Sequence, residues 1–172
     1  MNVLNTSSKT VALVGHSAAG KSACLAYMNV NSAADMDLAL GIHKAPSLAT
    51  VLSWLADTSR PPIVIVSNHE KMLKAIHAAK LSGEYANLFN RILFVYLCKP
   101  KERLKRHLSK PTAEGILRPF EHQEYTLNHY DHFHRLFTGL GHEIIDCSTA
   151  STADVAQRVR EISLQTKEVN RG

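Results

Sequence analysis

Near its amino terminus the chain carries the octapeptide Gly15-His16-Ser17-Ala18-Ala19-Gly20-Lys21-Ser22, which fits the pattern G-x-x-x-x-G-K-[ST]. The apolar run before it, Val11 to Val14, predicts a buried strand, and the residues from Ser22 to Met28 favour a helix. Strand, glycine loop and helix therefore follow one another in the order that phosphate binding requires. The alternative for this octapeptide is a glycine-containing turn with a solvated lysine.

The pattern gives each part of the loop a separate chemical task. Backbone N–H groups surround the β-phosphate of a nucleotide, the Lys21 ammonium reaches the β- and γ-phosphate oxygens, and the Ser22 hydroxyl binds Mg²⁺. We therefore expect an ATP or GTP site in which Lys21 is catalytic and Ser22 is a metal ligand. The expected nucleotide-binding residues of the loop are Gly15, His16, Ser17, Ala18, Ala19, Gly20, Lys21 and Ser22.

The length and composition are those of one globular domain without a membrane span. A chain of 172 residues is long enough for a single compact core and short for two ordinary domains. Its longest apolar run extends only from Ile92 to Cys98, whereas a helix needs roughly 20 residues to cross a bilayer. The segment from Met1 to Lys9 lacks the apolar core of a signal peptide, so we expect a cytoplasmic protein.

The three cysteines, Cys24, Cys98 and Cys147, are far apart in the sequence, and each lies in an apolar stretch. This spacing matches neither a disulfide framework nor a zinc site. We therefore expect reduced core residues.

The formal net charge of +5 comes largely from basic residues between Lys99 and Arg118. A surface of this kind attracts polyanionic phosphates. Three interpretations of the stretch remain open: a nucleotide-binding lid, a nucleic-acid patch, or the solvated face of an ordinary helix.

Strand and helix patterns alternate along the chain, which is typical of an α/β domain with a parallel sheet. Ile63–Val66 is apolar throughout, as strands buried on both faces are. Ser47 and Thr152 predict the N-caps of two helices. We expect strands near 10–14, 33–35, 63–66, 92–97 and 142–146. We expect helices from the glycine loop to Asn29, after Ser47, over 70–81, 101–108 and 121–136, and after Thr152, with a mobile loop over 109–119.

Three further features follow in order: an Asp-x-Asp after the second strand, Asp35-Met36-Asp37; an arginine in the helix after the fourth strand, Arg106; and an Arg-Pro pair in the next loop, Arg118-Pro119. With the phosphate loop and five strands, this arrangement resembles the shikimate kinase group of small P-loop kinases over nearly the whole chain. The resemblance implies an α/β, three-layer P-loop NTPase fold with a five-stranded parallel sheet in the order 2-3-1-4-5 and a lid loop over about 109–119.

The resemblance also implies ATP and Mg²⁺ as cofactors and a role for each residue. Asp35 supports Mg²⁺, often through water, whereas Asp37 holds the acceptor hydroxyl and takes its proton. Arg118 folds over the phosphates during transfer, and Arg106 stacks on adenine. Phosphoryl transfer needs charge neutralisation, positioning and exclusion of water, all of which such a set supplies. The expected catalytic residues are Lys21, Asp37 and Arg118.

Each of these residues also has a simpler interpretation. Asp35 and Asp37 fit the N-cap and first-turn acid of a short helix. Arg118 fits a surface arginine in a flexible loop, and Arg106 fits a solvated helix charge.

The acceptor site departs from the shikimate kinase pattern. That group carries a glycine run after the third strand, where this chain has Ser67-Asn68-His69-Glu70. It also holds the shikimate carboxylate with two arginines, one after the Asp-x-Asp and one on the helix before the last strand. Between Asp37 and Arg60 the only cation of this chain is Lys44, and residues 125–130, where the second arginine is expected, contain none. Loss of a bidentate carboxylate fork is not a conservative change, so we expect an acceptor other than shikimate.

Asn68 and His69 follow the carboxyl end of a central strand. Open α/β sheets bind ligands in the crevice at this end. We therefore expect both residues to contact the acceptor together with Asp37.

Four histidines lie close together after the loop: His122, His129, His132 and His134. They do not form the H-E-x-x-H pattern of a zinc site. We expect them to pack with aromatic residues along one helix, with part of that face near the acceptor.

The leading hypothesis is a kinase that transfers the γ-phosphate of ATP, with Mg²⁺, to a hydroxyl of a small metabolite or nucleoside-like acceptor. A polynucleotide or modified-base kinase is a second hypothesis, consistent with the basic balance, although a nucleic-acid partner is not preferred. A third is a nucleotide-binding regulatory protein with little transfer activity, which is favoured only by the replacement of the family's glycine run with residues 67–70. No pattern in the sequence specifies the acceptor, a preference for ATP over GTP, or the oligomeric state.

Overall fold

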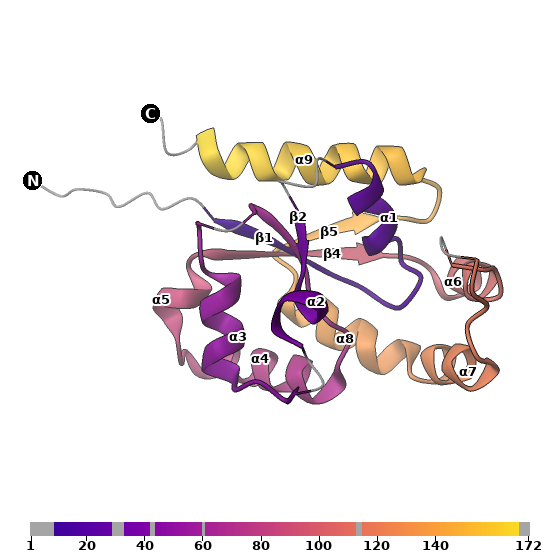
Figure 1. The fold of residues 1–172 in the computed structure, drawn as a ribbon, viewed down its shortest axis with the longest axis horizontal. Coiled ribbons are helices and arrows are strands. Elements are labelled where there is room, and N and C mark those ends of the chain that lie inside the picture. The colour runs from indigo at the N-terminus through magenta and orange to yellow at the C-terminus, as the bar shows by residue number, and fades with distance from the viewer. Residues whose placement is uncertain (1–8, 29–32, 42–43, 60, 113–114, 169–172) are drawn as a thin grey trace, which may run out of the picture.

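The computed structural model describes residues 9–28, 33–41, 44–59, 61–112 and 115–168. Within these ranges five parallel strands form one sheet in the order β2-β3-β1-β4-β5. The strands are β1 (Thr10–Val14), β2 (Ala33–Asp35), β3 (Ile63–Ile65), β4 (Ile92–Cys98) and β5 (Glu143–Asp146). The α/β fold and the strand order 2-3-1-4-5 are therefore confirmed (Figure 1).

β1 is the central strand, and the phosphate loop follows its carboxyl end. In the sheet register Val11 lies between Ile63 of β3 and Leu93 of β4. Because the strands are parallel, their carboxyl ends lie at one edge, where β2 ends at Asp35. In Figure 1 the arrowheads of β4 and β5 point toward α6 and α7, so these two helices lie beyond that edge.

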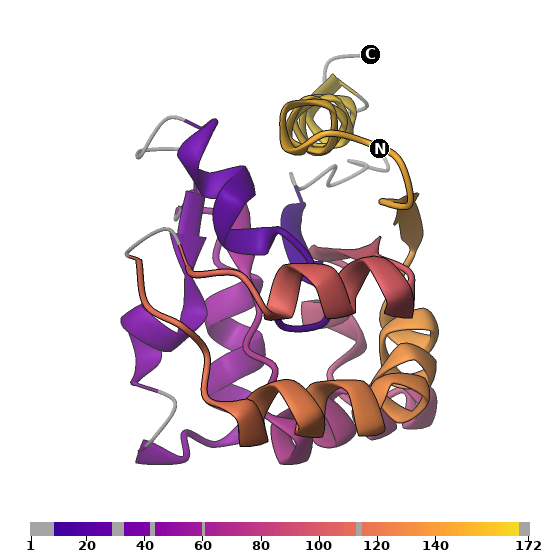
Figure 2. The same ribbon diagram turned by 90° about the vertical axis from the view of Figure 1, so that its right-hand side faces the viewer.

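Helices cover both faces of the sheet. One face carries α1 (Lys21–Ala26) and α9 (Thr152–Glu168). The other carries α3 (Leu48–Leu55), α4 (Glu70–Ser82), α5 (Ala86–Phe89) and α8 (Tyr130–Leu140). The remaining helices are α2 (Met36–Leu40), α6 (Lys101–Leu108) and α7 (Phe120–Asn128). Figure 2 shows α6 and α7 on the near side, with the loop that joins them passing along one flank of the molecule.

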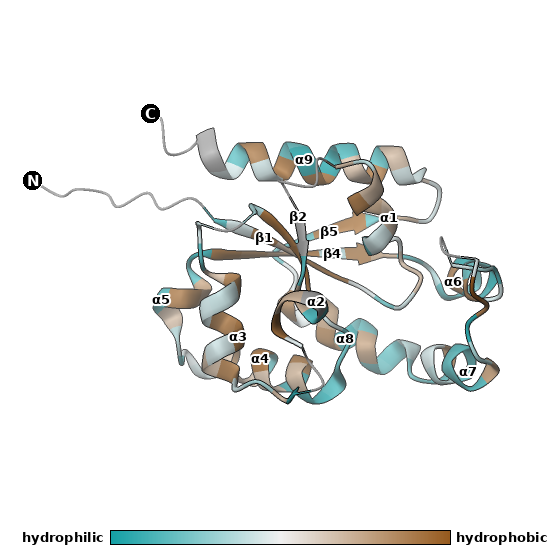
Figure 3. Cartoon of the chain, viewed as in Figure 1, coloured by the Kyte–Doolittle hydropathy of each residue, from teal (hydrophilic) through white to brown (hydrophobic). Residues whose placement is uncertain are grey.

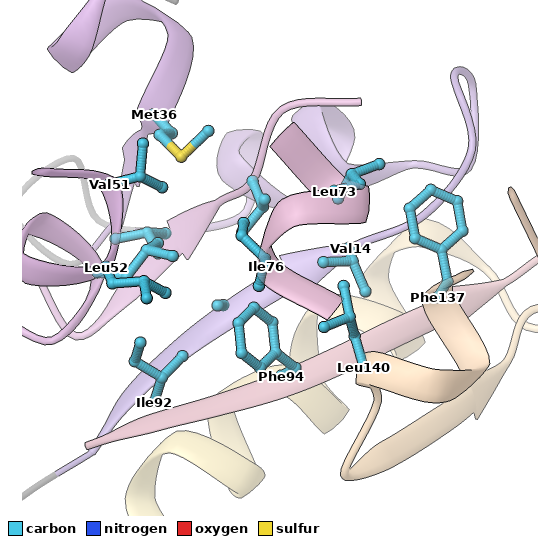
Figure 4. Packing of buried hydrophobic residues seen from close by; sticks show 14 of the residues in the cluster. Val14, Met36, Val51, Leu52, Leu73, Ile76, Ile92, Phe94, Phe137 and Leu140 are labelled. Atoms are coloured by element: carbon cyan, nitrogen blue, oxygen red, sulfur yellow. The ribbon is translucent and has the colours of Figure 1, made fainter. Parts of the chain in front are cut away.

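Alternate residues of the central strand belong to two separate cores. Val11 and Leu13 pack toward α1 and α9, whereas Ala12 and Val14 pack toward α3, α4 and α8. All four are fully buried, as their unbroken apolar sequence predicted. Figure 4 shows the second of these cores, around the buried ring of Phe94. Figure 3 shows the same arrangement by hydropathy, with apolar strands enclosed by helices that carry hydrophilic residues on their outer faces.

Two predicted helices differ from the structure. The helix expected over 121–136 is divided at His129, whose dihedral angles are φ −102° and ψ 13°, into α7 and α8. α7 packs against α6, whereas α8 packs against α4 and β4, and the turn at His129 lets the chain reach both sets of partners. α1 ends at Ala26, and its predicted end at Asn29 lies outside the described residues.

Side-chain caps fix the start of two helices. The Ser47 hydroxyl accepts the Thr50 N–H at 3.2 Å at the start of α3, as predicted. The last helix begins one residue differently from the prediction: Ser151, not Thr152, is the cap. Its hydroxyl accepts the Asp154 N–H at 3.1 Å, and the Asp154 carboxylate accepts the Ser151 N–H at 3.3 Å, which forms a reciprocal capping box.

The connection between α6 and α7 contains neither helix nor strand in its described residues, 109–112 and 115–119. The Thr112 N–H donates to the Ile116 carbonyl at 2.8 Å, which closes a turn around Gly115. The side chains of Ile116 and Leu117 are exposed on this loop.

All three cysteines are free; Cys24 and Cys147 are buried, as expected of core residues, whereas Cys98 is partly exposed. Burial raises the pKa of Cys24 and that of Cys147 to about 11, so both thiols stay protonated near neutral pH. None of the helices in the described ranges is both long and apolar enough to cross a membrane.

Candidate active site

A cleft of about 930 Å³ opens at the carboxyl edge of the sheet, between the phosphate loop, the start of α2, the end of β3 and the loop after α6. Most of the predicted site residues line it. They are His16, Ser17, Ala18, Ala19, Gly20, Lys21, Ser22, Asp35, Asp37, Asn68 and Arg118. Three predicted residues do not line it: Gly15, His69 and Arg106.

Gly15 brings the phosphate loop close to β4. A Cβ atom at this position would lie 3.0 Å from the Leu97 carbonyl oxygen and 3.2 Å from the Ala19 Cβ. The neighbouring backbone could not yield without moving the loop, so the first glycine of the motif is required for packing rather than for contact with the cleft.

The middle of the loop is a tight turn. Ala18 has a φ of 64° and Gly20 a φ of 103°, both in the left-handed region. The Ala19 N–H donates to the His16 carbonyl at 3.0 Å and closes the turn. For an alanine the left-handed conformation costs roughly 1–2 kcal/mol, so contacts around Ala18 must stabilise it.

The Lys21 side chain folds back over the loop. Its ammonium donates to the carbonyls of Gly15 and His16 and, at 3.1 Å, to Oδ1 of Asn68. Burial lowers the pKa of Lys21 to about 7, and the carboxylates of Asp35 and Asp37 act in the opposite direction. The ammonium is thus withdrawn from solvent and surrounded by acceptors at the wall of the cleft, and its flexible stem allows it to change partners.

Asp35 and Asp37 combine both of the interpretations that the sequence left open. Oδ1 of Asp35 accepts the Asp37 N–H at 2.8 Å, so Asp35 caps α2. Both side chains also line the cleft and stabilise the charged form of Lys21. Helix capping therefore orients an acidic pair toward the lysine of the phosphate loop.

The two residues after β3 that were predicted to contact the acceptor, Asn68 and His69, differ in position. Asn68 lines the cleft and is bonded to Lys21. His69 is exposed, and its Nδ1 accepts the Met72 N–H at 3.4 Å as the N-cap of α4. Its position gives His69 a structural role and does not match the expected contact with the acceptor.

Arg118 reaches the cleft from the loop between α6 and α7. Its guanidinium donates to the carbonyls of His107, at 3.4 Å, and Lys110, at 3.2 Å. The side chain of Gln123 donates in turn to the Arg118 carbonyl at 2.8 Å. Arg118 thereby covers the carboxyl end of α6, where helix carbonyls lack intrahelical partners.

Two further functional candidates, Lys99 and His107, were not indicated by any sequence pattern, whereas Arg106 of α6 was predicted. Arg106 is exposed and lies off the cleft, whereas Lys99 and His107 line it. The Lys99 ammonium donates to Nδ1 of His107 at 2.9 Å and to the Ala18 carbonyl at 3.0 Å. The only local signal was the position of Lys99 directly after the carboxyl end of β4.

The His16 side chain is buried, although His16 is one of the residues that line the cleft. The ring stacks on Tyr130 with centroids 4.3 Å apart, meets Phe137 edge-on, and donates from Nε2 to the Tyr130 carbonyl at 3.0 Å. Burial lowers its pKa to about 4, against the effect of the bond to Tyr130. His16 therefore anchors the loop to α8 as a neutral side chain.

The four clustered histidines pack with aromatic and polar neighbours, and no set of three metal-ligating side chains gathers in the described part of the chain. His129 stacks on Tyr125, and His134 stacks on Tyr130. His122 contacts the phosphate loop, because its Nε2 is 3.0 Å from the Ser17 hydroxyl.

No protein-family model matches the chain, and no curated protein sequence matches it. Solved structures do resemble it. A shikimate kinase from Acinetobacter baumannii in complex with shikimate is 17% identical with a TM-score of 0.58, and the match covers 92% of this chain and 94% of that one. A shikimate kinase from Bacteroides thetaiotaomicron is 11% identical with a TM-score of 0.54 and coverage of 92% and 98%. The chain therefore has the small P-loop kinase fold of the shikimate kinases.

Proposed function

We propose that this protein is a kinase that transfers the γ-phosphate of ATP, with Mg²⁺, to a hydroxyl group of a small metabolite or nucleoside-like acceptor. One observation carries the proposal: Lys21, the Asp35–Asp37 pair and Arg118 come from three separate segments and line the same cleft. The shared fold supports a phosphotransferase that acts on a small molecule.

The phosphate loop would hold the triphosphate of ATP. The Lys21 ammonium has three N–H donors, whose partners are two loop carbonyls and Asn68. Phosphate oxygens are stronger acceptors than these neutral groups, because charge-assisted hydrogen bonds are roughly twice as strong as neutral ones. Nucleotide binding would therefore redirect Lys21 from its neutral partners to the β- and γ-phosphates.

The transfer step needs an oriented hydroxyl and neutralised charge. The acceptor oxygen forms a bond to the γ-phosphorus as the bond from that phosphorus to the β–γ bridging oxygen breaks, and ADP departs with the electron pair. The hydroxyl proton passes to the Asp37 carboxylate, which is exposed at the cleft. Arg118 would leave its two carbonyl partners to bind the transferring phosphoryl group.

The oxygen donors present at the cleft fit Mg²⁺. The Ser22 hydroxyl is exposed there, and the Asp35 carboxylate lies on the same cleft. Mg²⁺ prefers oxygen ligands and is commonly held by one or two protein groups together with water and phosphate. Bound at these residues, the ion would neutralise charge on the phosphate oxygens.

Asn68 is the residue we assign to acceptor binding beside Asp37. Its Oδ1 accepts from Lys21, so the NH₂ group of the same amide can donate to an acceptor hydroxyl. An amide and a carboxylate suit a hydroxylated compound better than a carboxylated one. This chemistry agrees with the absence of the two shikimate-binding arginines from the sequence.

The test is a screen of hydroxylated metabolites, nucleosides and oligonucleotides for Mg²⁺-dependent ADP release above background hydrolysis. We expect a small hydroxylated compound to stimulate release, and Lys21→Ala and Asp37→Asn to reduce the stimulated rate by roughly a hundredfold or more. Lys105→Ala is the matched control, because Lys105 is an exposed cation of α6 that lies off the cleft and has no assigned role.

Two results would contradict the proposal. Nucleotide binding without transfer to any acceptor would indicate the regulatory protein instead. Activity confined to oligonucleotides, with affinity that falls steeply as salt rises, would indicate the nucleic-acid kinase.

A further inference from the structure

The side of the cleft beneath the loop after α6 carries three cations, Lys99, Lys110 and Arg118, which we call the lid-side cations. Lys99 is the most buried of them, with 5% of its surface exposed. It follows β4 directly, so the sheet and the start of α6 hold its backbone in place. A lysine at this depth is rarely retained without a charged partner.

Within the described residues, the side chains of Lys99 and Arg118 donate their recorded hydrogen bonds to neutral groups. Lys99 donates to the Ala18 carbonyl and the His107 imidazole, and Arg118 donates to the carbonyls of His107 and Lys110. Arg103, which does not line the cleft, donates to the carbonyls of Cys147 and Ala150.

Neighbouring charges add to the cost of burying Lys99. Burial lowers the pKa of Lys99, and Arg103 and Arg118 lower it further. The ion pairs that the structure records in its described part involve other residues, Lys74, His132 and Arg158, with carboxylates elsewhere. A buried cation among cations is unfavourable until an anion joins it, and such groups are characteristic of functional sites.

The hydrogen bonds of Lys99 to the Ala18 carbonyl and to His107 hold its ammonium beside the phosphate loop. The Ala18 carbonyl belongs to a left-handed residue of the loop, and His107 lies in α6, the helix that begins two residues after Lys99. These two partners account for two of the three N–H donors of the ammonium, and both partners line the cleft together with Lys99. The third donor is thus carried on a fixed group at the wall of the proposed phosphate site.

We infer that Lys99 is a second cationic ligand for the phosphate groups of a nucleoside di- or triphosphate, which it contacts from the lid side of the cleft while Lys21 contacts them from the side of Asp35 and Asp37. His107 is a positioning residue that holds the Lys99 ammonium in place. The inference rests on the proposed function, because it takes the phosphate loop as the nucleotide site. It adds a charge that the P-loop pattern does not contain.

The test compares ADP with adenosine, which has no phosphates, in calorimetric titrations of the full chain. Lys99→Met should weaken ADP binding by roughly ten- to a hundredfold, the loss expected for one charge-assisted contact, and change adenosine binding by less than about twofold. Lys99→Gln keeps a donor for the Ala18 carbonyl but removes the charge, and it should show the same loss. Lys101→Met is the matched control, because Lys101 is exposed at the start of α6 and lies off the cleft.

Thermal melting of the free protein separates a ligand-binding role from a structural one. If Lys99 is held for an anion, Lys99→Met should melt at the same temperature as the wild type or higher, since it removes an uncompensated buried charge. ADP binding by Lys99→Met and Lys99→Gln within about twofold of the wild type would overturn the inference, as would an equal loss of ADP and adenosine binding. Should Lys99→Met fail to fold, Lys99→Gln carries the test.

The two proposals fail in different ways. ADP binding that is abolished by Lys21→Ala but unchanged by Lys99→Met would leave the proposed function intact and refute the role of Lys99. A wild-type protein that binds no ADP with Mg²⁺ would refute the proposed function itself.

Discussion

The Lys21 ammonium lies 3.1 Å from the side-chain oxygen of Asn68, so a hydrogen bond joins the segment after β3 to the phosphate loop. Asn68→Asp places a carboxylate at this distance from the ammonium, which raises the pKa of Lys21 and competes with phosphate for its charge. We expect the affinity for ADP to fall by roughly tenfold, measured by calorimetry. Asn90→Asp, at the exposed end of α5, is the control and should bind ADP as the wild type does. Equal affinity of Asn68→Asp and the wild type would contradict the prediction.

Stability should rise with pH above neutrality because of Lys21. Burial lowers its pKa from 10.5 to about 7, so between these values the unfolded chain binds a proton that the folded chain has released. The free energy of unfolding therefore increases with pH across this window. Urea denaturation at several pH values should show a shallower increase in Lys21→Met than in the wild type or in Lys71→Met, an exposed control on α4. Parallel slopes for Lys21→Met and the wild type would refute the assignment.

His16 should make the protein sensitive to acid. Its pKa falls from 6.5 to about 4 on folding, so the unfolded chain takes up a proton first as the pH decreases, and stability is lost across that window. The loss amounts to roughly 3 kcal/mol. His16→Phe keeps an aromatic ring against Tyr130 and should flatten the decrease in the free energy of unfolding. His129→Phe, an exposed ring, should leave it unchanged, and an unaltered slope in His16→Phe would count against this account.

The parts of the site that the sequence predicted are local in the chain. A strand, a glycine loop and a helix follow one another within residues 10–26, and the Asp-x-Asp directly follows β2. Their periodicity and spacing carry enough information to place them. The predicted strand order was correct as well, but it came from a resemblance and not from the periodicity of the strands.

The parts that the sequence missed depend on contacts between distant segments. Lys99 meets the Ala18 carbonyl across 81 positions, and His16 meets the Tyr130 carbonyl across 114. No local pattern encodes such pairs, because they exist only once the helices pack on the sheet. Arg106 and His107 are adjacent on α6, where neighbouring side chains point about 100° apart, and in the structure His107 lines the cleft whereas Arg106 does not.

Gly15 offers a test of the loop that does not depend on charge. An alanine Cβ there would press on the Leu97 carbonyl and the Ala19 side chain, which should cost roughly 1–3 kcal/mol of stability and displace the loop. Gly83→Ala is the control: with a φ of 77° it is strained but has open space around it, so it should cost about 1 kcal/mol and leave the cleft intact. Denaturation should therefore show both variants destabilised, and calorimetry should show weaker ADP binding in Gly15→Ala alone. If both variants bind ADP equally well, close packing of the loop on β4 is not what maintains the site.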